Sequence, residues 1–211
     1  MSKPTEDEAT ELAEILAKRR SNNLRRRGGP SGAQVEEEFK ERAVLHIKDP
    51  YDYQGRSFLH PPHDVDVPLH RADHSPSRCF LPKRLLHTWT GHSKSLTAIR
   101  LFPVTGHLLL SCSMDAKIKL WEVYHERRCV MTYHGHKQAI RDICFNRHGD
   151  RFVSAGYDRF LKLWDTETGQ CVRKFTNRKI AYCVKFNVAD DAHSHYFLTG
   201  KSSISFGYIH F

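Results

Sequence analysis

Histidine, serine, aspartate and tryptophan recur at fixed spacing in the second half of the chain. A histidine beside an aspartate is a pairing that acid–base catalysis uses, so these residues are the first candidates for chemistry. The whole set occurs twice, however, whereas a catalytic site would occur once. We therefore interpret both sets as structural hydrogen-bonded chains and expect no enzymatic activity. The sets are His92, Ser111, Asp115 and Trp121, and His136, Ser154, Asp158 and Trp164.

These residues belong to an internal repeat. Gly91-His92 recurs as Gly135-His136 after 44 residues, and Trp121-Glu122 recurs as Trp164-Asp165 after 43. Four short apolar runs with turn signals between them fill each repeat. This period, strand count and pair of marks are typical of a WD40 β-propeller blade. The predicted strands are Leu96–Phe102, Leu108–Ser113, Lys117–Val123, Cys129–Tyr133, Ala139–Phe145, Arg151–Ala155, Phe160–Asp165 and Cys171–Phe175.

A third repeat begins and then departs from the pattern. Tyr182–Asn187 and Tyr196–Gly200 match the first two strands, but residues 201–211 lack the turn aspartate and the Trp-Asp mark. The predicted fold is thus all-β, with two complete WD40 blades and a partial third. Because propellers typically close with 4–8 blades, we expect a ring that is not closed.

The chain divides into three predicted regions. Residues 1–43 are charged and mostly disordered, with one short helix at Thr5–Arg20. Residues 44–84 form an extended partner-binding segment, and residues 85–211 form the partial propeller. Two basic clusters in the first region suggest nuclear targeting. They are Lys18, Arg19 and Arg20, and Arg25, Arg26 and Arg27.

Composition and charge exclude several classes of protein. The chain has 39% hydrophobic residues and no apolar run long enough to span a bilayer, so we expect no membrane association. Its six cysteines contain no C-x-x-C pair, and its Pro- and His-rich stretch has irregular spacing, so we expect neither disulfides nor a metal. No cofactor motif is present, and we expect no cofactor and no small-molecule substrate.

The positive charge is concentrated in the repeats. Residues 1–80 carry 13 Lys and Arg against 14 Asp and Glu, whereas residues 81–211 carry 20 against 10. A basic folded surface favours polyanions such as RNA, or acidic proteins. General solubility would explain the same charge.

A segment outside the generic repeat points to a particular family. The segment consists of Tyr51, Asp52, Tyr53, Gln54, Gly55, Arg56 and Ser57. Together with Leu108–Tyr124 and Leu161–Cys171, it resembles the pre-mRNA-processing factor 17 family of WD40 splicing factors, and the match runs from about Val44 to Phe186.

The resemblance implies a function. It implies a nuclear, non-catalytic spliceosome component of the second catalytic step, exon ligation. In that family the segment before the propeller contacts proteins and RNA, and the propeller is a docking surface. The family has a full propeller, so we expect this chain to be a truncated form. The alternatives are a generic WD40 adaptor in a ubiquitin-ligase or chromatin complex, and a non-functional truncated copy.

Overall fold

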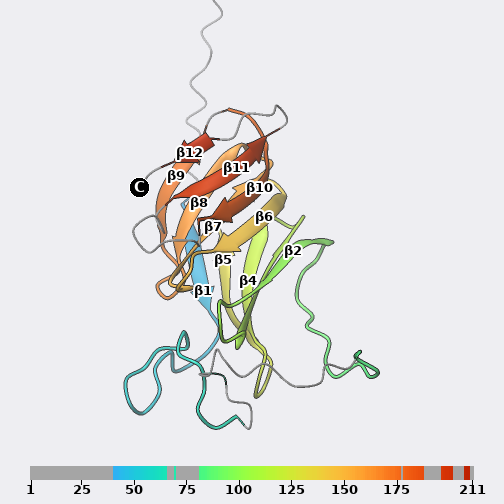
Figure 1. The fold of residues 1–211 in the computed structure, drawn as a ribbon, viewed down its shortest axis with the longest axis vertical. Coiled ribbons are helices and arrows are strands. Elements are labelled where there is room, and N and C mark those ends of the chain that lie inside the picture. The colour runs from blue at the N-terminus through green and yellow to red at the C-terminus, as the bar shows by residue number, and fades with distance from the viewer. Residues whose placement is uncertain are drawn as a thin grey trace, which may run out of the picture. The chain divides into compact units, whose positions relative to one another are not determined.

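Strands dominate the computed structural model, which describes residues 40–65, 69, 81–176, 178–187, 196–201 and 207–209 (Figure 1). Every regular element in these ranges is a β-strand, which confirms the all-β prediction. The predicted helix at Thr5–Arg20 lies outside them. Within the same ranges, no helix is long and apolar enough to cross a membrane.

Two antiparallel sheets correspond to the two predicted complete blades, and the prediction is confirmed. In each, consecutive strands pair with their neighbours, so the chain forms a simple meander. The first contains β2 (Leu96–Leu101), β3 (Leu108–Ser113), β4 (Lys117–Glu122) and β5 (Cys129–His134). The second contains β6 (Ile140–Phe145), β7 (Arg151–Gly156), β8 (Phe160–Asp165) and β9 (Cys171–Thr176).

A three-stranded sheet forms the partial third blade, and the ring is not closed. Its strands are β10 (Ala181–Phe186), β11 (Phe197–Lys201) and β12 (Gly207–Ile209), again in sequential order. The sequence predicted that the repeat pattern is lost after the second strand of this blade, and the third strand is only 3 residues long.

The second blade is packed on both faces. Tyr133 of the first blade meets Phe152 and Trp164 of the second edge-to-face, with ring centroids 4.9 and 5.7 Å apart. A second apolar cluster joins the opposite face, including Leu163, to Val184 and other residues of the third blade. Aromatic pairs of this geometry add to the free energy gained by burial.

A short strand that sequence analysis missed extends the first blade. β1 (Arg42–Leu45) pairs antiparallel with the outer strand β5, so this sheet has five strands. It crosses the predicted boundary between residues 43 and 44. The Ala43 side chain also lies against Gly169 of the second blade, where an added Cβ would collide with it. β1 therefore contacts two blades at once.

Glu41, just before β1, fixes this strand to the second blade. Its carboxylate accepts hydrogen bonds from Lys162 Nζ at 2.6 Å and Lys174 Nζ at 2.7 Å. Lys162 is almost fully buried and also donates to the Gly135 carbonyl. Burial alone would raise the pKa of Glu41, but the two lysines outweigh it and hold that pKa below its ordinary value.

Replacing this carboxylate tests the connection. We expect Glu41→Gln to lower the free energy of unfolding by about 1–3 kcal/mol, because Lys162 keeps its charge but loses its counter-ion. Since the folded-state pKa is depressed, the stabilisation is present above the ordinary value of 4.5 and is lost as pH falls through the folded pKa. Urea unfolding at pH 7 and below pH 4.5 measures both effects.

The control is Glu126→Gln, because that side chain is 70% exposed and pairs with the surface arginine Arg128. Equal losses in the two variants, or a Glu41→Gln loss that persists at acid pH, would contradict the proposed pairing.

Candidate functional site

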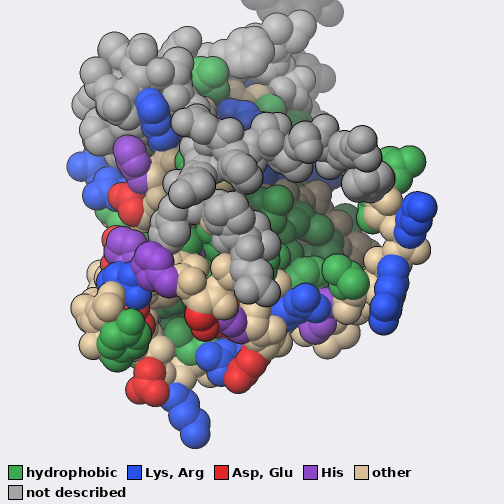
Figure 2. Space-filling model, turned by 60° about the horizontal axis from the view of Figure 1, so that its bottom comes forward, with side chains coloured by type: hydrophobic (Ala, Val, Ile, Leu, Met, Phe, Trp, Pro, Cys, Tyr) green, Lys and Arg blue, Asp and Glu red, His purple; other side chains and the backbone are tan. Residues whose placement is uncertain are grey.

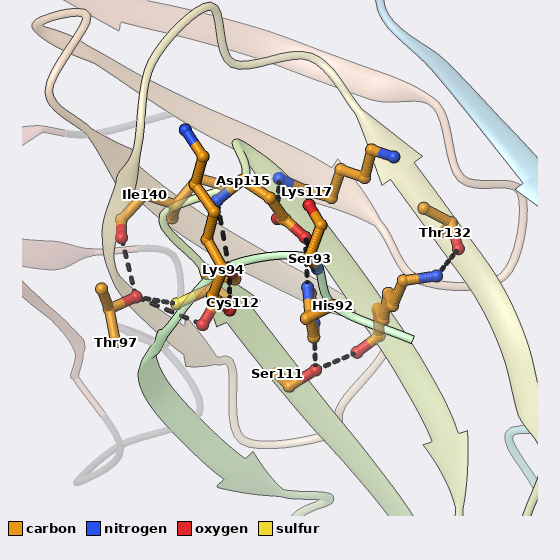
Figure 3. Close-up of polar contacts among 12 residues, drawn as sticks. His92, Ser93, Lys94, Thr97, Ser111, Cys112, Asp115, Lys117, Thr132 and Ile140 are labelled. Atoms are coloured by element: carbon orange, nitrogen blue, oxygen red, sulfur yellow. Dashed lines mark hydrogen bonds and ion pairs between the residues drawn. The ribbon is translucent and has the colours of Figure 1, made fainter. Parts of the chain in front are cut away.

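The four repeated residues of the first blade form one hydrogen-bonded chain. His92 lies between Asp115 and Ser111, with Nδ1 2.9 Å from the carboxylate and Nε2 2.8 Å from the hydroxyl (Figure 3). Trp121 Nε1 donates to the same hydroxyl at 2.8 Å. Because the carboxylate only accepts, His92 Nδ1 carries the proton and Nε2 accepts from Ser111. The loop before β2 is thereby joined to β3 and β4.

The second blade repeats this geometry. His136 Nδ1 lies 2.9 Å from Asp158 Oδ2, and His136 Nε2 lies 2.7 Å from Ser154 Oγ. Trp164 Nε1 donates to Ser154 Oγ at 2.9 Å. In this blade the serine, the histidine and the tryptophan are all buried. Ser111 and Ser154 are only 3% and 0% exposed, so neither hydroxyl can be reached by a substrate.

The aspartates also hold their turns. Asp115 accepts the backbone N–H groups of Ser93 and Lys117, at 3.1 and 2.9 Å. Burial alone would raise the pKa of Asp115 and of Asp158, but hydrogen bonds from the histidines and from backbone N–H groups outweigh it and lower both. The ionised carboxylates thus act as fixed acceptors that set the conformation of each turn.

The described residues of the third blade do not form this chain. Thr199 stands opposite Gly207 as Ser154 stands opposite Lys162, so threonine occupies the serine position. By the same register, Ile209 occupies the tryptophan position. Thr199 is only 1% exposed, and among the described residues its hydroxyl has no hydrogen-bond partner. A buried hydroxyl without a partner lowers stability.

The segment Tyr51–Ser57 forms a compact turn beside the first blade. Asp52 accepts the backbone N–H groups of Gln54 and Arg56, at 2.8 and 2.9 Å, and pairs with the Arg56 guanidinium at 2.6 Å. Gly55 has φ +77°, a left-handed conformation that suits glycine. Tyr53 at the tip is 92% exposed. The turn is thus held by its own contacts, while its aromatic tip projects into solvent.

Neighbouring residues fasten this turn to the blade. The His46 backbone N–H donates to Val130 at 2.8 Å, and its ring Nε2 bonds Thr132 at 2.9 Å. Ile47 is buried in the core, and the partly buried Phe58 side chain packs against the same core. The turn that carries the predicted partner-binding residues is therefore held against the first blade.

A cavity of about 450 Å³ lies between the turn and the first blade. Its lining includes Tyr51, Tyr53 and Arg56 from the turn, with Glu122 and Arg128 from the blade. Figure 2, which brings the lower end of Figure 1 forward, shows acidic, basic and histidine side chains intermingled on this face. The two blade residues of this cavity were not predicted from the sequence, because they lie about 70 residues further along the chain than the turn. The predicted nuclear-targeting clusters at residues 18–20 and 25–27 lie outside the described residues.

Substitutions at equivalent positions test the hydrogen-bonded chains. Ser154→Ala should lower the free energy of unfolding by about 2 kcal/mol, because Trp164 Nε1 and His136 Nε2 stay buried but lose their hydrogen-bond partner. Thr199→Val should be neutral or raise it by about 1 kcal/mol, because it removes a hydroxyl that has no partner. Thermal or denaturant unfolding compares the two, and similar losses in both variants would contradict the difference between the blades.

Comparison with known proteins agrees with the geometry. The family described as "WD domain, G-beta repeat" matches residues 83–122, which contain β2 to β4, and residues 127–165, which contain β5 to β8. The match confirms that the repeats are WD40 repeats.

Longer matches extend beyond the repeats. Pre-mRNA-processing factor 17 of Homo sapiens and that of Mus musculus are each 56% identical over 203 residues, which is 96% of this chain and 33% of theirs. Pre-mRNA-processing factor 17 of Saccharomyces cerevisiae is 41% identical over 133 residues, 63% of this chain and 29% of the yeast protein. The chain spans about a third of the length of these relatives. The chain contains two WD40 repeats and is similar to pre-mRNA-processing factor 17 over almost its whole length.

Proposed function

We propose that this chain is a nuclear, non-catalytic component of the pre-mRNA splicing machinery. It acts as a docking scaffold for spliceosomal proteins and RNA in the second catalytic step, exon ligation. The observation that carries the proposal is that similarity to pre-mRNA-processing factor 17 covers 96% of the chain, far beyond the two repeats. A likeness confined to the repeats would favour only a WD40 fold, because fold alone does not define function.

The geometry of the turn at residues 51–57 supports protein docking. Tyr51 and Tyr53 are 56% and 92% exposed, and tyrosine is enriched among residues that dominate binding at interfaces. The turn is preorganised by Asp52 and Arg56, so little conformational entropy is lost on binding. The adjoining cavity gives a partner side chain room beside these rings.

A basic and aromatic surface on the inner strands supports contact with RNA. A cavity of about 580 Å³ is lined by β2, β6 and β10, including Arg100, Arg141 and Tyr182. The Arg141 guanidinium lies 5.9 Å from the centre of the Tyr182 ring, which is exposed. Exposed rings beside cations are the features on which single-stranded bases stack. Arg100 is partly neutralised by Asp142, 2.6 Å away.

The alternatives differ in what they require of the turn. A generic WD40 adaptor in a ubiquitin-ligase or chromatin complex would bind through its blades, and a non-functional truncated copy would bind nothing specifically. Only the splicing proposal gives Tyr51–Ser57 a role in recruiting spliceosomal particles.

Removing the exposed ring tests this role without disturbing the fold. Tyr53→Ala should reduce the amount of small nuclear RNA that co-purifies with the tagged chain from nuclear extract by about tenfold, as expected for an interface residue that contributes over 1 kcal/mol. Deleting Tyr51–Ser57 should abolish it. RNA recovery is measured by reverse transcription and quantitative amplification.

The matched control is Leu81→Ala, an equally exposed residue outside the turn. Recovery that is unchanged in both the Tyr53 variant and the deletion would exclude the turn as the docking element. A chain that recovers no small nuclear RNA before mutation would contradict the splicing function itself.

A further inference from the structure

The three inner strands begin at the same end of the sheets. Thr97 Oγ1 on β2 donates to the carbonyl of Ile140 on β6 at 2.7 Å. Two residues further along β6, Asp142 accepts the backbone N–H of Val184 on β10 at 3.0 Å and pairs with Arg100 on β2. The strands therefore run side by side in the same direction, and the loops that precede β2, β6 and β10 lie at one end of the molecule. This end is called the loop end.

The hydrogen-bonded chains bring further turns to the loop end. Asp115, in the turn between β3 and β4, bonds His92 in the loop before β2 (Figure 3). Asp158, in the turn between β7 and β8, bonds His136 in the loop before β6. Each complete blade therefore presents one loop and one turn on this surface.

Exposed cations occupy these loops and turns from the first blade to the third. Thr176 Oγ1 donates to the Arg159 carbonyl at 2.9 Å and accepts the Arg178 N–H at 3.2 Å, so the two arginines are neighbours although they belong to different loops. Among the described residues, none of the exposed cations of the loop end pairs with a carboxylate. These cations are Lys94, Lys137, Arg141, Arg159 and Arg178.

The described carboxylates at the loop end are bound and covered. Each has 12% or less of its side chain exposed and pairs with a histidine, a lysine or an arginine. The opposite end differs, because there cations and acids are both exposed and pair with each other, as Arg128 does with Glu126 at 2.8 Å. Only positive charge therefore reaches solvent at the loop end of the described residues. The covered carboxylates are Glu41, Asp115, Asp142 and Asp158.

Two partly exposed aromatic rings lie among the cations. Arg141 and Tyr182 occupy equivalent positions, because β6 and β10 carry a bulge at the same place. The Tyr182 ring is 42% exposed and has the Arg141 guanidinium 5.9 Å from its centre. Phe160, which is 39% exposed, follows Arg159 directly. Rings beside cations suit the bases and phosphates of a single strand, whereas an acidic protein needs only the cations.

We propose that the loop end binds the phosphate backbone of single-stranded RNA without regard to sequence. The five cations neutralise phosphates along a path across three blades, and Tyr182 and Phe160 stack on bases. The inference rests on the proposed splicing function and gives it a defined RNA-binding surface, which extends the Arg141–Tyr182 contact onto the surrounding loops.

Neutralising three of the cations tests the surface. In the full chain, Lys137→Gln, Arg159→Gln and Arg178→Gln together should weaken binding to an oligouridine of about 20 nucleotides at least about tenfold at ~0.1 M salt. The slope of the logarithm of the binding constant against the logarithm of salt concentration should become shallower by about 2, because each phosphate contact on a single strand contributes roughly 0.7. Fluorescence anisotropy measures both quantities.

The matched control removes the same charge from the opposite end. Lys48→Gln, Arg147→Gln and Arg151→Gln together should change the affinity less than about twofold and leave the slope unchanged. Equal losses in the two triple variants would overturn the proposal, because they would show that net charge alone attracts the RNA. Thermal unfolding of both variants confirms that the fold is kept.

The aromatic ring distinguishes RNA from an acidic protein. Tyr182→Ala should weaken oligouridine binding about tenfold with little change in the salt slope, because it removes stacking and no charge. Polyglutamate of the same length represents an acidic protein. Polyglutamate that binds as tightly as oligouridine, or a Tyr182 variant that binds RNA normally, would overturn the assignment to RNA.

Failure of this inference is distinguishable from failure of the splicing proposal. If the loop-end variant binds oligouridine normally while the tagged chain still recovers small nuclear RNA, the surface is wrong and the splicing function stands. If the wild-type chain binds oligouridine through the loop end but recovers no small nuclear RNA from nuclear extract, the surface stands and the splicing function is wrong.

Discussion

The structure depends on the burial of both faces of the second blade. This blade is apolar on both sides, so it requires an apolar partner against each face. The second blade meets this condition: Trp164 and Phe152 are fully buried towards the first blade, and Leu163 is fully buried towards the third. Because burying a large apolar side chain contributes about 1.5–3 kcal/mol, these contacts outweigh any single hydrogen bond in the fold. The hydrogen-bonded chains then fix one orientation of the packed side chains and turns among those that burial permits.

The hydrogen-bonded chains show how this selection works. Trp164 must place its ring in the interface and its Nε1 against Ser154, so its orientation is fixed from two sides. His136 relays that constraint to Asp158 and to the turn. The third blade keeps the buried apolar positions Val184 and Phe186, but its described residues form no such polar chain, and among them the buried Thr199 hydroxyl has no hydrogen-bond partner. Apolar packing can thus be present in a blade whose described residues form no polar chain.

Sequence analysis predicted what is periodic and missed what is not. The strands of the two complete blades and the eight residues of the hydrogen-bonded chains were predictable, because each mark occurs twice at nearly constant spacing. β1 was not, since a four-residue strand has little signal of its own and its pairing with β5 lies about 90 residues away. Glu41 was missed for the same reason, because its partner Lys162 is 121 residues along the chain. The turn at Tyr51–Ser57 was singled out only by resemblance to a family.

β1 connects the two complete blades to the turn at Tyr51–Ser57, on which the proposed function depends. It is joined to the first blade by backbone pairing and to the second by Glu41, so its end at Leu45 has a fixed position. Tyr51 follows six residues later, with His46 and Ile47 anchored to the blade in between. The exposed tyrosines therefore take their position from a strand that bridges two blades.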